Sequence, residues 1–206
     1  MGGYDPYSSS KGCSELITSA YRQSFLNDLG VGVATARSGN VIGGGDWADN
    51  RLIPDILKSI DNGTPVIIRN PHAVRPWQHV LAPLSGYMTL AERLWSNPSL
   101  YSGGWNFGPN EQDAKPVGWL VDKLVEMFPN ATWELEAKAK AKAHEAPFLN
   151  LDISKAKTEL DWSPTWDLET TLEKISGWHS SWRSGKNMKV RCLDEIKQFM
   201  KSNTEK

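Results

Sequence analysis

Apolar residues return every three or four positions between Tyr7 and Leu29, which is the period of an amphipathic helix. Asp5 is a suitable N-cap, and Pro6 suits the first helical position because the N–H that proline lacks has no partner there. The pattern predicts a helix from Tyr7 to Leu29.

Short β-branched or apolar runs alternate with segments of helical period along the rest of the chain. We expect strands at residues 31–37, 66–68, 105–107 and 132–135. We expect helices at residues 52–60, 79–95, 117–128, 154–160, 168–182 and 193–200. Strands that alternate with helices predict an α/β fold, in which helices cover a parallel or mixed sheet.

Composition excludes several classes of protein. The chain has 206 residues and a formal net charge of −1, and its charges are interspersed, so neither a nucleic-acid partner nor a polybasic membrane surface is expected. Its 2 cysteines form no disulfide or metal-binding pattern, and no apolar run is long enough to cross a membrane. We expect a cytoplasmic protein without a metal.

Tyr7 and Lys11 form a Tyr-x-x-x-Lys pattern in the predicted first helix. Residues four apart lie on one face of a helix, about 5–6 Å apart at Cβ, so both side chains would point into one site. A neighbouring ammonium group favours the phenolate that a general base requires. A chance match without a catalytic role is the alternative, because the bare pattern is common.

A glycine-rich loop at residues 38–46 runs into the sequence Gly-Gly-Gly-Asp-Trp-Ala at residues 43–48. These six residues match the G-x-G-x-x-A form of a dinucleotide-binding turn. However, Asp46 would lie beside the pyrophosphate, and the acidic residue expected about 20 positions later is absent. We interpret the glycines as a sharp turn between a strand and a helix.

Residues 137–143 alternate alanine with lysine. A helix would place Lys138 and Lys142 as like charges four positions apart, which is unfavourable. A solvated loop or a fraying helix is the favoured interpretation, and a basic phosphate-binding patch is the alternative.

Several sequence strings resemble those of a known enzyme family. The strings at residues 5–11 and 36–47 resemble the extended short-chain dehydrogenase/reductases. Five further strings narrow the resemblance to the CDP-glucose 4,6-dehydratase branch, and they lie at residues 51–55, 74–80, 105–109, 144–146 and 151–156. The resemblance extends over almost the whole chain.

The resemblance implies a fold and a division into domains. The fold would be the C-terminal portion of a Rossmann-like doubly wound sheet, joined to a small α/β substrate-binding subdomain. Residues 1–50 would be the remnant of the NAD-binding domain. Residues 51–206 would mainly bind the sugar nucleotide, with a strand at 105–107 returning to the Rossmann sheet.

The resemblance also implies an NAD-dependent dehydratase that converts CDP-glucose to CDP-4-keto-6-deoxyglucose. Tyr7 would take the proton of the glucose 4-hydroxyl while hydride passes from C4 to NAD, and Lys11 would bind the nicotinamide ribose. Water would then leave across C5 and C6, and the hydride would return to C6. The alternatives are a dehydratase or epimerase for another nucleotide sugar, and a non-catalytic remnant that binds a sugar nucleotide.

Seven substrate-binding positions are carried over from the resemblance: Asn40, Arg51, Leu52, Arg69, Arg75, Asn106 and His144. A planar guanidinium suits bidentate contact with a diphosphate, and Arg75 lies in the string that supplies such an arginine. Instead of binding substrate, Asn40 could simply be a turn residue, and each arginine could be a solvated surface charge. Glu145 is a weaker candidate beside His144. The tryptophans are expected in the core rather than as stacking platforms for cytosine; Trp47 and Trp77 are the two to test as such platforms, because they lie inside the specific strings.

In this family the glycine-rich NAD-binding turn and the acid and base that expel water precede the tyrosine, and this sequence contains neither. We therefore expect the 206-residue chain by itself to be inactive and either poorly stable or prone to aggregate, because most strands of its sheet would be missing. The resemblance implies pairing through a bundle of the helix that bears the tyrosine and the helix before it, so the full-length enzyme is expected to be a homodimer. Only the tyrosine helix lies in this sequence, which leaves the oligomeric state of this chain open.

Overall fold

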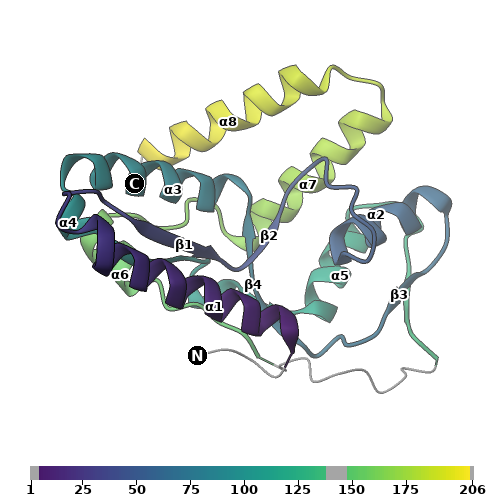
Figure 1. Ribbon diagram of the computed structural model, residues 1–206. Helices are drawn as coiled ribbons and strands as arrows, with labels where there is room; N and C mark the ends of the chain where they lie inside the picture. Colours follow the sequence, from purple (N-terminus) through teal and green to yellow (C-terminus); the bar gives the residue numbers. More distant parts are fainter. Residues whose placement is uncertain (1–4, 138–147, 205–206) are drawn as a thin grey trace. The chain divides into compact units, whose positions relative to one another are not determined.

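The computed structural model describes residues 5–137 and 148–204, and Figure 1 traces the order of their elements. The helices are α1 (Pro6–Tyr21), α2 (Leu52–Asn62), α3 (Leu81–Ser96), α4 (Pro98–Tyr101), α5 (Val117–Glu126), α6 (Ser154–Leu160), α7 (Leu168–Arg183) and α8 (Met188–Thr204), with a π-helical turn η1 (Arg22–Leu26) and a 3-10 turn η2 (Glu111–Asp113). The strands are β1 (Ala34–Ser38), β2 (Asn40–Ile42), β3 (Val66–Ile68), β4 (Val74–His79), β5 (Gly103–Phe107), β6 (Ala114–Pro116) and β7 (Trp133–Leu135).

The chain forms two compact units, each assembled from three separate stretches of sequence. The first unit comprises residues 1–38, 84–107 and 151–163, and the second comprises residues 39–83, 108–150 and 164–206. The division into domains that we predicted from the sequence stays a prediction.

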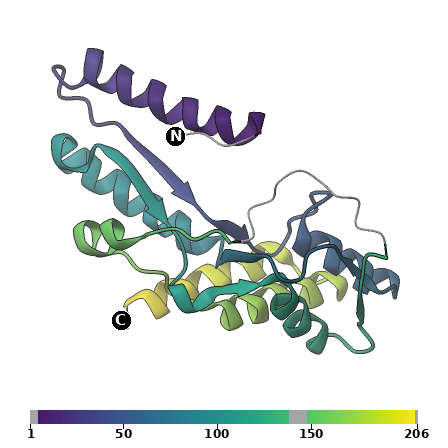
Figure 2. The same cartoon turned by 90° about the horizontal axis from the view of Figure 1, so that it is seen from below.

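In the first unit, β1 and β5 lie side by side as a parallel pair (Figures 1 and 2), with Ala34 opposite Gly103 at the start of the register. Phe107 of β5 is fully buried, and its ring meets Trp162 edge-on with 5.0 Å between the ring centroids. Gly86 of α3 makes room for this ring, because a Cβ there would lie 2.2 Å from Phe107 Cδ1. The position therefore requires glycine.

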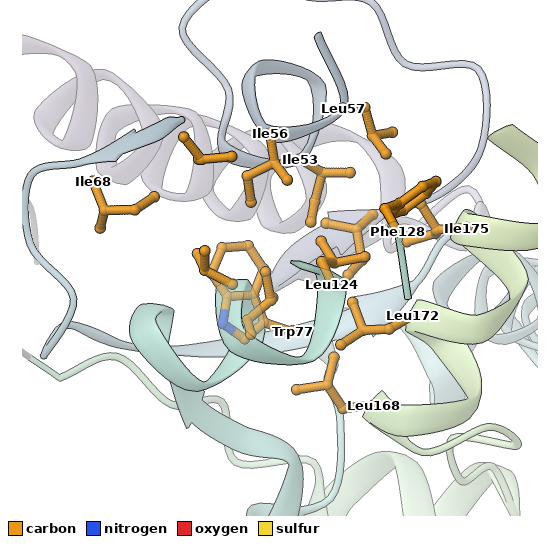
Figure 3. Close-up of a cluster of buried hydrophobic side chains, with 14 residues drawn as sticks. Ile53, Ile56, Leu57, Ile68, Trp77, Leu124, Phe128, Leu168, Leu172 and Ile175 are labelled. Carbon is orange, nitrogen blue, oxygen red and sulfur yellow. The ribbon is translucent and has the colours of Figure 1, made fainter. Parts of the chain in front are cut away.

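The second unit contains a three-stranded sheet and a separate two-stranded sheet. β2 runs parallel to β4, β4 runs antiparallel to β6, and β3 pairs with β7 in parallel. Side chains of α2, α5 and α7 gather around Trp77 of β4 in one hydrophobic core (Figure 3). Full burial of a large apolar side chain contributes about 1.5–3 kcal/mol, so this core is a main source of stability for the unit.

The amphipathic pattern of α2 explains both its orientation and its end. Ile53, Ile56 and Leu57 are buried, at the spacing of one helix face. Gly63 follows the helix with φ +64°, a left-handed conformation that glycine adopts without steric cost. The helix therefore ends at the Asn62-Gly63 pair, two residues beyond the predicted end at residue 60.

Every helix and strand predicted from the pattern is present; β3 and α6 have the predicted bounds, and the others have shifted ends. The first helix is shorter than predicted, since α1 ends at Tyr21 and the π-helical turn ends at Leu26. α8 is longer than the predicted segment 193–200. The last predicted strand corresponds to β7.

Four elements were missed. We placed residues 40–42 in a loop and His79 in a helix, but β2 and β4 form and pair with each other. Local periodicity cannot show that pairing, because the two strands are far apart in the sequence. The short elements β6 and α4 were also not predicted.

Candidate functional site

Tyr7 and Lys11 lie on one face of α1, as their spacing predicts. Asp5 caps this helix, because its Oδ1 accepts a hydrogen bond from the Ser8 N–H at 2.9 Å, and Pro6 takes the first helical position. Lys11 Nζ lies 5.4 Å from the centroid of the Tyr7 ring. Both side chains are exposed, Tyr7 by 73%, so the described part of the first unit leaves the pair open to a ligand.

A carboxylate and a guanidinium fasten α1 to β1. Glu15 accepts hydrogen bonds from Arg37 Nε and Nη2, both at 2.7 Å, and from the Thr35 hydroxyl at 2.8 Å. The hydrogen bond to Arg37 lowers the pKa of Glu15, and Glu15 in turn raises the pKa of Arg37. Two parallel N–H···O bonds define orientation as well as distance, so this pair orients the helix that carries Lys11.

Sequence reasoning did not assign this supporting role to Glu15 or Arg37. The available signal was the position of Glu15, four residues after Lys11 and therefore on the same face of the helix.

Asn106 of β5 belongs to the same polar network. Its Oδ1 accepts a hydrogen bond from Arg37 Nη1 at 2.9 Å, and its Nδ2 donates to the Asp152 carbonyl at 3.1 Å. Both ends of the amide are thus engaged by protein groups. Its predicted contact with the nucleotide stays a prediction.

Asn40 and Arg75 lie on paired strands of the second unit. Asn40 begins β2 and stands opposite Trp77 of β4. Arg75 lies two residues earlier on β4, is buried, and donates from Nη1 to the Val74 carbonyl at 2.8 Å. The structure therefore brings these two predicted substrate positions into one sheet.

Arg51, Leu52 and Arg69 lie at the ends of elements of the same unit. Arg51 is the N-cap residue of α2 and Leu52 is its first residue; the Arg51 side chain is exposed. Arg69 follows β3, and its Nε lies 3.6 Å from Glu136 Oε2 in an exposed ion pair, a kind that adds little stability. Both guanidinium groups are therefore accessible to an anionic ligand.

Several predicted features lie outside the described residues. His144 and Glu145 are among them, as is the Ala-Lys run from residue 138 onward. Within residues 5–137 and 148–204, no three His, Cys, Asp or Glu side chains are grouped as metal ligands. No helix in those two ranges has the length and apolar character needed to span a bilayer.

The glycine-rich loop is covered by protein rather than open as a cradle. A Cβ at Gly43 would lie 2.8 Å from Val80 Cγ1, and a Cβ at Gly44 would lie 2.2 Å from Trp178 Cγ. Gly45 alone has a left-handed backbone, with φ +81°. The interpretation as a turn is therefore right for Gly45, whereas close packing requires Gly43 and Gly44.

The two tryptophans of the specific strings have different surroundings. Trp77 is a core residue, as expected, and its Nε1 donates to the Lys115 carbonyl at 3.3 Å. The same expectation is wrong for Trp47, which is 53% exposed. The reason is that Trp47 packs beside Trp182 of α7, itself partly exposed, with 4.5 Å between the ring centroids.

Comparison with known sequences finds a similar enzyme. No protein-family profile matches the chain. Over 210 residues the chain is 52% identical to the CDP-glucose 4,6-dehydratase of Salmonella typhimurium, a match that covers 99% of this chain. The chain resembles a CDP-glucose 4,6-dehydratase. The chain spans 58% of the length of that relative. The match confirms the resemblance predicted from the sequence strings.

Three solved structures with a similar fold carry the names of sugar-nucleotide enzymes. The dTDP-glucose 4,6-dehydratase of Bacillus anthracis, solved with NAD, matches with a TM-score of 0.66 at 19% identity, over 88% of this chain and 54% of that one. The UDP-glucuronic acid 4-epimerase of Bacillus cereus, solved with its sugar nucleotide and NAD, matches with a TM-score of 0.69 at 20% identity, over 86% and 53%. The UDP-glucose 4-epimerase of Thermotoga maritima matches with 0.66 at 19% identity, over 84% and 52%. These likenesses confirm the predicted α/β, Rossmann-like fold class.

Proposed function

We propose that the chain forms part of an NAD-dependent CDP-glucose 4,6-dehydratase, which converts CDP-glucose to CDP-4-keto-6-deoxyglucose. The observation that carries the proposal is the 52% identity to such an enzyme over 99% of this chain. The geometry of Tyr7 and Lys11 supports it, since the first step needs a base with a cation beside it.

Tyr7 is the proposed base for the glucose 4-hydroxyl. As phenolate it takes the hydroxyl proton, and the ammonium group of Lys11 stabilises that phenolate. The Glu15–Arg37 pair keeps α1 on β1 while the proton moves. The acid and base that expel water across C5 and C6 are not assigned to residues of this chain.

The Tyr7–Lys11 face fits the ribose of a nicotinamide cofactor. When bound, NAD would accept hydride from C4 and return it to C6. The exposed Lys11 ammonium group can donate hydrogen bonds to the ribose hydroxyls, and the Tyr7 phenolate oxygen can accept one from them. The loop at residues 43–45 does not fit the pyrophosphate, because the Trp178 indole fills the space beside Gly44.

Guanidinium and amide groups of the second unit are proposed to bind the CDP-glucose diphosphate. Arg51 and Arg69 are exposed, and Arg75 and Asn40 lie on the paired strands β4 and β2. Guanidinium groups suit this role because two of their N–H groups can bind one phosphate. Leu52, His144 and, in the first unit, Asn106 are further proposed substrate-binding positions.

The second candidate function is that of an epimerase or a dehydratase for another nucleotide sugar. The observation in its favour is that the solved structures with a similar fold include 4-epimerases as well as a dTDP-glucose 4,6-dehydratase. The two classes share a first oxidation and differ in the later steps, so product analysis separates them.

We also propose a homodimer for the active enzyme. Exposed apolar side chains of α1 and of the turn that follows it, Ile17, Tyr21 and Phe25, provide an apolar surface for pairing. Burial of such a surface between two copies would be favourable.

The deciding experiment is turnover of CDP-glucose by this chain fused to the part of the Salmonella dehydratase that lies outside the match. We expect the 4-keto-6-deoxy product by mass spectrometry, with little product from dTDP-, UDP- or GDP-glucose. An epimer would support the second candidate, and product from another nucleotide alone would overturn the assignment of the substrate. Titration of CDP-glucose into the 206-residue chain, followed by calorimetry, tests binding without turnover.

A further inference from the structure

The loop between β2 and α2 joins two of the proposed substrate-binding positions. Asn40 precedes the loop on β2, and Arg51 follows it at the start of α2. Residues 43–51 form no helix or strand and include three consecutive glycines. Local structure therefore does not define the path of this loop, and tertiary contacts must do so.

Trp178 of α7 supplies the closest of these contacts. A Cβ at Gly44 would lie 2.2 Å from its Cγ, and a Cβ at Gly45 would lie 3.1 Å from its Cζ2. The indole is 8% exposed, and its Nε1 donates to Cys192 Sγ of α8 at 3.3 Å. The indole is thus held on one side by α8 and lies directly on the loop backbone on the other.

Other side chains of α7 contact the later part of the loop and the helix α2 that follows it. Trp47 of the loop packs beside Trp182, with 4.5 Å between the ring centroids. His179 Nε2 and Arg183 Nε lie 2.9 Å and 3.3 Å from Asp61 Oδ1, and Asp61 lies in the last turn of α2. α7 therefore contacts both the loop and the helix that the loop enters.

We propose that Trp178 is a positioning residue for the nucleotide-sugar site. Its indole defines the path of residues 43–51, and thereby the placement of Arg51 relative to Asn40. The inference rests on the proposed function, because it assigns to Trp178 the support of groups that bind the diphosphate. A displacement of about 1 Å in groups that orient a substrate can lower the rate as much as a hundredfold. A displacement of the loop away from the indole would move Arg51 and should therefore weaken the binding of the nucleotide sugar.

The test is a double-mutant cycle of Gly44→Ala and Trp178→Ala in the fused enzyme. Gly44→Ala displaces the loop from the indole, and we expect faster amide hydrogen exchange at residues 43–51 and a Kd for CDP-glucose raised about tenfold. In the Trp178→Ala background the added methyl group meets no indole, so the same substitution should then change the Kd less than twofold. Gly177→Ala is the matched control, because its Cβ would meet only the end of the Arg191 side chain, at 3.2 Å.

In the fused enzyme, Gly44→Ala should raise KM about tenfold and change kcat less than twofold, a split that general destabilisation would not produce. If Trp178→Ala fails to fold, the test is the comparison of hydrogen exchange and Kd between Gly44→Ala and its control Gly177→Ala. Unchanged exchange and an unchanged Kd in Gly44→Ala would overturn the inference and leave the proposed function standing. Failure of the unmodified chain and of the fused enzyme to bind CDP-glucose would overturn both.

Discussion

Tyr7 is 73% exposed at the start of α1, so its ring contributes little to packing. Its hydroxyl is the group that the proposed chemistry requires. Loss of that hydroxyl should therefore affect activity and leave folding unchanged.

We expect Tyr7→Phe to lower dehydratase turnover in the fused enzyme by about 10²- to 10⁴-fold, the usual contribution of a general base. The free energy of unfolding should change by less than about 0.5 kcal/mol, as for other exposed positions. Tyr101→Phe, in α4 and partly exposed, is the control and should keep full turnover. Equal turnover in both variants would remove Tyr7 from the mechanism.

Asp113 is a buried carboxyl group in the turn before β6. Its Oδ1 accepts a hydrogen bond from the Leu168 N–H at the start of α7, at 3.0 Å. Burial raises the pKa of Asp113, and the hydrogen bond from Leu168 offsets part of that effect. Because the folded-state pKa lies above the unfolded-state value, ionised Asp113 reduces stability at neutral pH, and this penalty disappears as the pH falls through the folded-state pKa.

Asp113→Asn should keep the acceptor for Leu168 and remove the buried charge. We expect the variant to be more stable at pH 7 by about 1 kcal/mol, with the difference vanishing below about pH 4, where wild-type Asp113 is protonated. Urea unfolding at several pH values measures this, with the exposed Asp28→Asn as the control. A less stable variant at pH 7 would show that the charge is needed.

At the scale of elements, α1 is held on β1 by polar contacts rather than by buried apolar side chains. No residue of α1 is buried, and Glu15 bonds Arg37 and Thr35 of β1. The attachment of α1 to β1 therefore depends on the negative charge of the Glu15 carboxylate.

We expect Glu15→Gln to lower the free energy of unfolding by about 1 kcal/mol at pH 7 and low salt. Arg37 lowers the folded-state pKa of Glu15, so this contribution is present above the unfolded-state pKa and is lost as the pH falls through the folded-state value. The difference between wild type and variant should thus shrink in acid. Glu92→Gln, an exposed carboxylate of α3, is the control and should show no such dependence.

At the scale of the whole molecule, apolar burial is uneven. Fourteen buried side chains form the core cluster of the second unit (Figure 3), whereas the apolar face of α1 is exposed in the first. Stability should therefore respond very differently to the same substitution in the two places.

Leu172→Ala and Leu16→Ala make a matched pair, because Leu172 is 0% exposed and Leu16 is 55% exposed. We expect Leu172→Ala to cost about 2–5 kcal/mol, since it leaves a cavity, and Leu16→Ala to cost less than about 0.5 kcal/mol. Urea unfolding measures both. Similar losses would mean that the face of α1 is buried in solution, for example between two copies.

The elements that could be predicted are those determined by residues close to one another in the sequence. The apolar face and the Asn-Gly stop of α2, and the cap and spacing that place Tyr7 beside Lys11, lie within a few residues of one another. The sequence strings likewise sufficed for the resemblance to CDP-glucose 4,6-dehydratases, because they are contiguous. The hydrogen bonds of Asn106 to Arg37 and Asp152, and the packing of Trp47 beside Trp182, could not be predicted, since the partners come from other elements.

The sequence by itself determined the main helices, the α/β class and the face of α1 that carries Tyr7 and Lys11, because periodicity, capping and turn residues act over short distances. Only the tertiary structure decided that β2 pairs with β4, that Glu15 bonds Arg37, and that the glycine loop lies on Trp178. These contacts join distant positions, as Asp61 and His179 do across 118 residues. Such contacts depend on how side chains fit after the chain has folded, and no local pattern encodes that fit.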